Sequence, residues 1–210
     1  MNTTVFEAIN ITKKYRNTLA LNQVSMSVMQ GDIYGFIGEN GAGKTTMIRL
    51  LTGLAEPTTG KIALFGESNK KLAKQRERIG CIIESPSLYL DMTAYENLEV
   101  QRLQRGIPGK GCIDNALALV GLKDTGKKKA KDFSLGMRQR LALAIALLGN
   151  PEFLVLDEPI NGLDPTGIIE LRNLLKRLNK ERGITILISS HILTEPVSYT
   201  HLRAHETPEH

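Results

Sequence analysis

The nine residues GENGAGKTT, Gly38 to Thr46, have the composition and spacing of a loop that binds phosphate groups. Glycines let such a loop curl so that its backbone N–H groups converge, and a helix that starts near Lys44 would add the positive end of its dipole. The Lys44 ammonium would reach the β- and γ-phosphates of a nucleotide, and the Thr45 hydroxyl would ligate Mg²⁺. The predicted nucleotide-binding residues are Gly38, Asn40, Gly41, Gly43, Lys44, Thr45 and Thr46.

A pair of carboxylates follows an apolar run in FLVLDEP, residues 153–159. We expect this run to be a strand that lies beside the strand leading into the phosphate loop. Asp157 at its end would then hold the Mg²⁺ shell, and Glu158 would polarise a water molecule against the γ-phosphate.

A second stretch suited to an anion is DFSLGMRQR, residues 132–140, in which Ser134 is placed to cap a helix. Taken alone, these residues are explained as well by a capped helix with a solvated basic face.

Short β-rich runs alternate with helical patterns along the chain, which is typical of an α/β fold. We predict strands at residues 5–11, 24–28, 33–37, 61–65, 79–83, 153–156 and 184–189. Helical patterns occupy 93–106, 112–122 and 134–149, in the interval where strands are absent. The simplest arrangement is a mostly helical subdomain inserted into a parallel-sheet core.

Composition narrows the class of protein further. The chain has 210 residues, the size of one ordinary domain, and its net charge of +5 comes from basic residues mixed with 22 acidic ones, which favours a solvated surface. Cys81 and Cys112 have no metal-ligand spacing, so a reducing cytosolic compartment is expected. We find no signal peptide and no membrane span, so a partner would supply any span.

Four motifs in order, GENGAGKTT, FSLGMRQR, LVLDEPINGLD and ISSH, resemble the nucleotide-binding domain of an ATP-binding cassette (ABC) transporter. The resemblance runs from about Val5 to about Glu195, so residues 1–195 form the predicted domain, incomplete at its C-terminus. It implies a P-loop NTPase core with a parallel sheet, an N-terminal antiparallel β subdomain, an inserted α-helical signature subdomain, and ATP and Mg²⁺ as cofactors.

The resemblance also implies roles for single residues. Two such domains dimerise head to tail, so Ser134 and Gly136 would bind the γ-phosphate of ATP held by a second ATP-binding subunit. Tyr15 would stack on adenine, and His191 would contact the γ-phosphate and help to hold the attacking water. The NGLD loop, residues 161–164, would communicate across the dimer.

The sequence departs from the family pattern in two segments. Glu84 stands where the family has glutamine and could still reach Mg²⁺ or the water, while Leu135 and Met137 replace a glycine and a glutamine of the signature. Both departures resemble the branch that handles bacitracin-type and lantibiotic peptides.

These resemblances predict an ATP-hydrolysing subunit that powers export of, or immunity to, a peptide antibiotic. It would act through a separate integral membrane permease, at the inner face of the cell membrane, without direct nucleic-acid binding. The alternative is a nucleic-acid- or ribosome-associated ABC ATPase. A chromosome-maintenance member of that class needs a long coiled coil between the loop and the signature, and the roughly ninety residues there have no heptad run.

The last residues, 196–210, do not match the family, and Pro196 would end the preceding helix. They include His201, His205 and His210. A metal-binding or tag-like tail is one interpretation. The other, which we favour, is that residues from Val197 onward are an in-frame translation of a sequencing-library adaptor, in which case a sheet edge or an apolar helix face stays uncovered.

Overall fold

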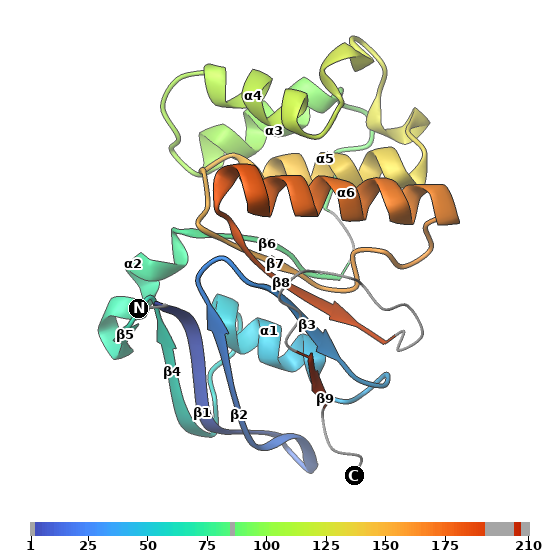
Figure 1. Cartoon of the computed structure of the whole chain (residues 1–210). Coiled ribbons are helices and arrows are strands. Elements are labelled where there is room, and N and C mark those ends of the chain that lie inside the picture. The colour runs from blue at the N-terminus through green and yellow to red at the C-terminus, as the bar shows by residue number, and fades with distance from the viewer. Residues whose placement is uncertain (1–2, 85–86, 192–203, 207–210) are drawn as a thin grey trace. The chain divides into compact units, whose positions relative to one another are not determined.

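The computed structural model describes residues 3–84, 87–191 and 204–206. The chain divides into two compact units (Figure 1). The first unit comprises Met1–Glu84, Glu152–Pro159 and Lys176–His210, and the second comprises Ser85–Pro151 and Ile160–Leu175.

An antiparallel sheet in the first unit has the strand order β2-β1-β4-β5. The strands are β1 (Thr4–Tyr15), β2 (Thr18–Met29), β4 (Thr59–Leu64) and β5 (Glu67–Ser68). A two-residue turn joins β1 to β2, and Arg16 in this turn has the positive φ of 48° that such tight hairpin turns require. The antiparallel β subdomain predicted from the sequence is present.

The second sheet of the first unit is parallel, with the order β6-β7-β8-β3-β9. Its strands are β3 (Ile33–Ile37), β6 (Ile79–Ile82), β7 (Phe153–Leu156), β8 (Thr185–Ser190) and β9 (Ala204–Glu206). Every residue of β7 is buried, as expected for a parallel strand that is covered on both faces. One expectation was wrong: β7 does not lie beside β3, because β8 pairs with both of them and separates them.

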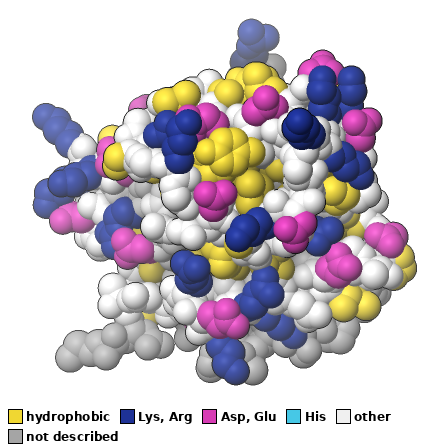
Figure 2. Space-filling view, turned by 90° about the horizontal axis from the view of Figure 1, so that it is seen from above, with side chains coloured by type: hydrophobic (Ala, Val, Ile, Leu, Met, Phe, Trp, Pro, Cys, Tyr) yellow, Lys and Arg dark blue, Asp and Glu magenta, His cyan; other side chains and the backbone are white. Residues whose placement is uncertain are grey.

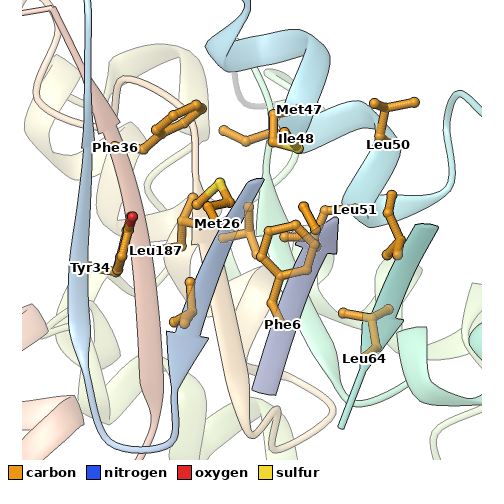
Figure 3. Close-up of a cluster of buried hydrophobic side chains, with 14 of the residues drawn as sticks. Phe6, Met26, Tyr34, Phe36, Met47, Ile48, Leu50, Leu51, Leu64 and Leu187 are labelled. Carbon is orange, nitrogen blue, oxygen red and sulfur yellow. The ribbon is translucent and has the colours of Figure 1, made fainter. Parts of the chain in front are cut away.

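Helix α1 (Lys44–Thr52) packs into the core of the first unit (Figure 3). Its apolar side chains belong to one buried cluster with side chains of β1, β2 and β4 from the first sheet and of β3 and β8 from the second. The labelled members of this core are Phe6, Met26, Tyr34, Phe36, Met47, Ile48, Leu50, Leu51, Leu64 and Leu187. This packing fixes the start of α1, and therefore the loop before it, against both sheets.

Arg76 stabilises the other end of α1. It belongs to α2 (Leu72–Arg76), which follows the 3₁₀ turn η1 (Asn69–Lys71). Its Nε donates to the carbonyl oxygen of Leu51 at 3.1 Å, and its Nη2 donates to that of Leu50 at 3.4 Å. The last carbonyls of a helix lack the usual donor one turn further on; Gly53 N donates to that of Leu50 at 3.2 Å, and the guanidinium caps both carbonyls. Burial lowers the pKa of Arg76, an effect that Glu56 opposes.

The second unit is helical, as predicted. It contains α3 (Ala94–Gln104), α4 (Gly111–Leu119), α5 (Leu135–Leu147), the 3₁₀ turns η2 (Lys123–Thr125) and η3 (Ala130–Asp132), and the first part of α6 (Pro165–Arg182). Thr93 and Glu96 form a reciprocal capping box at the start of α3. The fully buried Asn97 accepts from Tyr89 N and donates to the carbonyl oxygens of Tyr89 and Thr93, which holds the preceding loop in place.

Strand β9 bears on the prediction for the end of the chain. Residues 196–203 and 207–210 lie outside the described part, whereas Ala204–Glu206 pairs with β3 along Gly35, Phe36 and Ile37. This edge of the sheet is therefore partly covered, and the expectation of an uncovered sheet edge or apolar helix face stays a prediction. The origin of the residues from Val197 onward stays a prediction.

Surface charge follows the mixed pattern of the sequence. Lys and Arg side chains are interspersed with Asp and Glu on the face seen in Figure 2, and no single basic patch dominates that face. Among the helices of the described residues, none is long and apolar enough to cross a membrane.

Candidate functional site

The loop between β3 and α1 has the geometry of a phosphate cradle. Gly41 and Gly43 have φ angles of +89° and +85°, a region that residues with a side chain rarely adopt. A Cβ atom on Gly43 would lie 2.5 Å from the carbonyl oxygen of Ala20 and 2.6 Å from Leu21 Cδ2. Gly43 is thus required both for its conformation and for its close approach to β2.

Lys44 is buried, with 6% of its surface exposed, and its ammonium bends back over this loop. Its Nζ donates to the carbonyl oxygens of Gly38 at 2.6 Å and Glu39 at 3.0 Å. The same Nζ lies 3.4 Å from Glu158 Oε1. Three oxygens therefore hold the Lys44 ammonium beside the loop, where its positive charge could bind phosphate groups.

Asp157 is buried at the end of β7 and is bound through both carboxylate oxygens. Thr45 Oγ1 donates to Oδ2 at 2.8 Å, and Ser189 Oγ donates to Oδ1 at 2.6 Å. The Ser189 hydroxyl also accepts the backbone N–H of Glu158 at 2.9 Å. Ser189, at the end of β8, thereby fixes both carboxylate residues.

The Glu158 carboxylate is held between two side chains, one on each oxygen. Oε1 faces the Lys44 ammonium, and Oε2 lies 2.7 Å from His191 Nδ1, which donates to it in the tautomer that is protonated there. Glu158 has a positive φ of 47°, so the backbone turns sharply directly after Asp157 and aims the two carboxylates differently. A base oriented in this way has a fixed position in which to accept a proton.

These residues fit Mg²⁺ and a nucleotide. Thr45 and Asp157 offer oxygen ligands side by side, and Mg²⁺ is usually bound by few protein oxygens because it keeps several waters and substrate phosphates. Among the described residues, no group of three or more His, Cys, Asp and Glu side chains gathers to form an all-protein metal cage.

The remaining sequence-predicted residues of the first unit lie in several elements. Asn40 belongs to the loop and Thr46 to the first turn of α1, while Tyr15 ends β1 with 41% of its surface exposed. Glu84 does not contact the Thr45–Asp157 pair through any of its hydrogen bonds in the described structure; it forms an ion pair with Arg49 of α1. Its assignment to the metal stays a prediction.

The signature segment belongs to the second unit. Ser134 is the N-cap of α5, and its hydroxyl accepts the backbone N–H of Met137 at 3.2 Å, which confirms the predicted cap. Gly136 lies in the first turn of this helix. A cavity of about 340 Å³ opens here, lined by Ser134, Leu135, Gly136, Arg140, Gly162, Leu163, Asp164, Thr166, Gly167 and Glu170. The signature and the NGLD loop thus border one hollow of the second unit.

Ser189, which contacts both Asp157 and Glu158, was not identified from the sequence. Its signal was weak because ISSH contains two adjacent serines, and the strand period alone does not say which of them faces the carboxylates. The signal that could have identified Ser189 is its position two residues before His191, on the strand that pairs with the strand of Asp157.

Comparison with known proteins is consistent with this geometry. The ABC transporter family model matches residues 21–161. The chain is 52% identical over 193 residues to the bacitracin transport ATP-binding protein BcrA of Bacillus licheniformis, covering 91% of this chain and 63% of that protein. It is 45% identical to the lantibiotic transport ATP-binding protein SrtF of Streptococcus pyogenes, covering 89% of this chain and 80% of SrtF.

A solved structure has the same fold. The dimeric ATP-binding cassette MJ0796, in a post-hydrolysis state bound to ADP and Pi, superposes with a TM-score of 0.76 at 27% identity, covering 90% of this chain and 88% of that one. The relatives named above are transport proteins, and none of the comparisons supports the nucleic-acid alternative. The chain belongs to the ABC transporter family, it carries the ATP-binding domain of that family, and its fold is that of the ATP-hydrolysing cassettes.

Proposed function

We propose that this chain hydrolyses ATP to ADP and phosphate, and that hydrolysis drives export of, or immunity to, a peptide antibiotic through a separate membrane permease. The observation that carries the proposal is the contact network of Lys44, Thr45, Asp157, Glu158 and His191. It combines a cation, a pair of oxygen ligands and an oriented base within one unit, as phosphoryl transfer to water requires.

Each side chain has a distinct task in this reaction. The Lys44 ammonium exchanges its contacts with the loop carbonyls and Glu158 for phosphate oxygens and offsets their negative charge. Thr45 and Asp157 would hold Mg²⁺, which would supply positive charge to neutralise the phosphates. Glu158 accepts a proton from the attacking water as the bond from the γ-phosphorus to the bridging oxygen breaks. His191 orients the Glu158 carboxylate through the 2.7 Å contact.

The complete site requires a second ATP-binding subunit. Ser134 and Gly136 lie at the N-terminal end of α5, where backbone N–H groups and the helix dipole favour an anion. We assign them to the γ-phosphate of ATP held by the partner in a head-to-tail dimer. The dimeric state described for MJ0796 supports this arrangement.

The transported substrate is inferred from relatives. BcrA and SrtF are named for bacitracin and lantibiotic transport, and this chain spans 63% of the length of BcrA. We therefore place the chain at the inner face of the cell membrane, bound to an integral membrane permease that carries a peptide of this class.

Phosphate release from ATP by the purified chain, with and without Mg²⁺, tests the enzymatic part. We expect phosphate release that depends on Mg²⁺ and that Lys44→Ala abolishes. The control Lys14→Ala removes the same charge from β1 and should leave phosphate release unchanged. Equal activity of Lys44→Ala and the unaltered chain would overturn the assignment. Co-purification with a membrane partner, followed by stimulation of the ATPase with bacitracin or a lantibiotic, tests the transport part.

A further inference from the structure

The β1–β2 hairpin, in which Tyr15 is the last residue of β1, is tied to the phosphate loop through an irregularity in strand pairing. Lys13 lies opposite Leu21, but Lys14 lies opposite Leu19, so the register skips Ala20. The carbonyl oxygen of Ala20 is the atom that a Cβ on Gly43 would approach to 2.5 Å. The bulge therefore packs directly against the phosphate loop, at the base of the hairpin that ends in Tyr15.

Lys13 holds the Tyr15 ring from one side. Its Nζ lies 4.7 Å from the centroid of the ring, within the range of a cation–π contact. The same ammonium donates a 2.7 Å hydrogen bond to the carbonyl oxygen of Glu56. Lys13 thus joins the ring to the chain segment that leads into β4.

That segment is itself anchored to β1, so the ammonium has a fixed position. Thr58 N donates to the carbonyl oxygen of Thr12 at 2.8 Å, and Lys14 N donates to Thr58 Oγ1 at 3.0 Å. A lysine side chain free in solvent would lose considerable rotamer entropy on settling over a ring. Here the Glu56 carbonyl and the anchored segment already restrict it.

We propose that Lys13 is a positioning residue for adenine recognition: its ammonium occupies one face of the Tyr15 ring, fixes the ring plane and leaves the opposite face for the adenine of ATP. This inference rests on the proposed function, in which Tyr15 stacks on the base. A cation on one face draws the π-electrons of the ring toward itself, which makes the other face a better partner for an electron-rich purine. With 41% of its surface exposed, Tyr15 retains area for such a contact.

The competing explanation is simple charge attraction, in which Lys13 favours any polyphosphate. Comparison of two ligands separates the two explanations, because inorganic triphosphate carries the charge of ATP without the base. Isothermal titration with Mg-ATP and with Mg-triphosphate would measure both dissociation constants for each variant.

The variants are Lys13→Met, which keeps the alkyl stem and removes the ammonium, its charge-matched control Lys14→Met, Tyr15→Leu, and the double variant Lys13→Met with Tyr15→Leu. We expect Lys13→Met to weaken ATP about three-fold, the size of a partly exposed cation–π contact, without changing triphosphate binding. Tyr15→Leu should weaken ATP about ten-fold, the loss of one stacked base. In the Tyr15→Leu background, Lys13→Met should not weaken ATP binding further. Lys14→Met should leave the ratio of the ATP and triphosphate dissociation constants unchanged.

The failures are distinguishable. If Tyr15→Leu leaves the ratio of ATP to triphosphate affinity unchanged, the stacking of Tyr15 on adenine is wrong, and the role of Lys13 falls with it. If Tyr15→Leu lowers the ratio but Lys13→Met does not, only the role of Lys13 is overturned. Equal weakening of ATP and triphosphate by Lys13→Met establishes charge attraction instead.

Discussion

The phosphate-loop side of the first unit and the signature segment of the second unit differ in how their polar groups are used. In the first unit, Asp157 is bound on both oxygens, and Glu158 is held between Lys44 and His191. In the second, the Ser134 hydroxyl accepts a hydrogen bond from the start of its own helix, and the neighbouring Leu135 is 48% exposed beside an open cavity. We propose that the first region is preorganised for catalysis and that the second is an anion-binding surface for a ligand held by another subunit.

Glu158→Gln gives the largest expected effect and tests the first region. The amide keeps the shape of the side chain but cannot accept a proton from water, so turnover should fall by roughly 10²- to 10⁴-fold while ATP binding persists. Because we expect hydrolysis to open the dimer, gel filtration with ATP should show a trapped dimer. Glu152→Gln, at the other end of β7, is the matched control and should retain turnover. Normal turnover of Glu158→Gln would remove Glu158 from the mechanism.

Ser134→Arg tests whether the second region serves the partner's site. A bulky cation at the start of α5 should lower turnover by roughly 10²- to 10³-fold, the value of an essential anion contact, yet leave nucleotide binding by the isolated chain unchanged. Fluorescence titration with a labelled ATP and a phosphate-release assay measure the two quantities. Loss of ATP binding by the isolated chain would contradict the assignment in trans.

A mixture of two inactive variants tests the same assignment more directly. A dimer of one Ser134→Arg chain and one Lys44→Ala chain contains one site with an intact Lys44 and an intact Ser134 from different subunits. Activity should therefore reappear when the two inactive variants are combined. If both residues served the same subunit's site, the mixture would stay inactive.

Ser189→Ala tests how far the first region depends on its supporting hydroxyl. Ser189 is fully buried, and its removal leaves Asp157 with one hydrogen bond fewer and the Glu158 N–H without a partner. An unsatisfied buried group costs about 1–3 kcal/mol, which a urea titration would detect as a lower unfolding midpoint. We expect turnover to fall about ten-fold, less than for Glu158→Gln, because the base itself remains. An unchanged midpoint would show that another group replaces the hydroxyl.

Short segments of both regions were predictable from the sequence, but the pairing of distant strands was not. Lys44, Thr45 and the Ser134 cap could be placed because each depends on residues within one short segment. The order of the parallel strands could not, since β8 enters between β3 and β7 after a long connection, and sequence patterns do not specify such pairings.

Two further features were missed. Helix α6 carries an apolar stripe at helical spacing, and our sequence analysis overlooked it; its buried members are Leu171, Leu174, Leu175 and Leu178. Glu84, which follows β6, forms an ion pair with Arg49 of α1, and these two residues lie 35 positions apart in the sequence. Local spacing therefore predicted the chemistry of the loop, while contacts between distant segments had to come from the fold.

The smallest expected effect compares one surface ion pair from each unit under acid. In the first unit, Arg78 donates to both oxygens of Glu152 at 2.7 Å, and in the second, Lys131 donates to Asp91 at 2.9 Å. The hydrogen bond from Arg78 lowers the pKa of Glu152, and that from Lys131 lowers the pKa of Asp91. A lowered carboxylate pKa means that each pair stabilises the fold above the pKa of the unfolded chain, and that this contribution is lost as pH falls through the folded-state pKa.

Glu152→Gln and Asp91→Asn should therefore lower the urea midpoint slightly at pH 7, and both deficits should shrink at acid pH. Because the Glu152 side chain is 54% exposed, we expect its pair to contribute only about 0.5 kcal/mol. The Arg78 guanidinium also lies 3.6 Å from the centroid of the Phe65 ring, so Arg78→Met should cost more than Glu152→Gln at every pH. A deficit of Glu152→Gln that grows as the pH falls would reverse the sign of this linkage and show that the carboxylate is destabilising when charged.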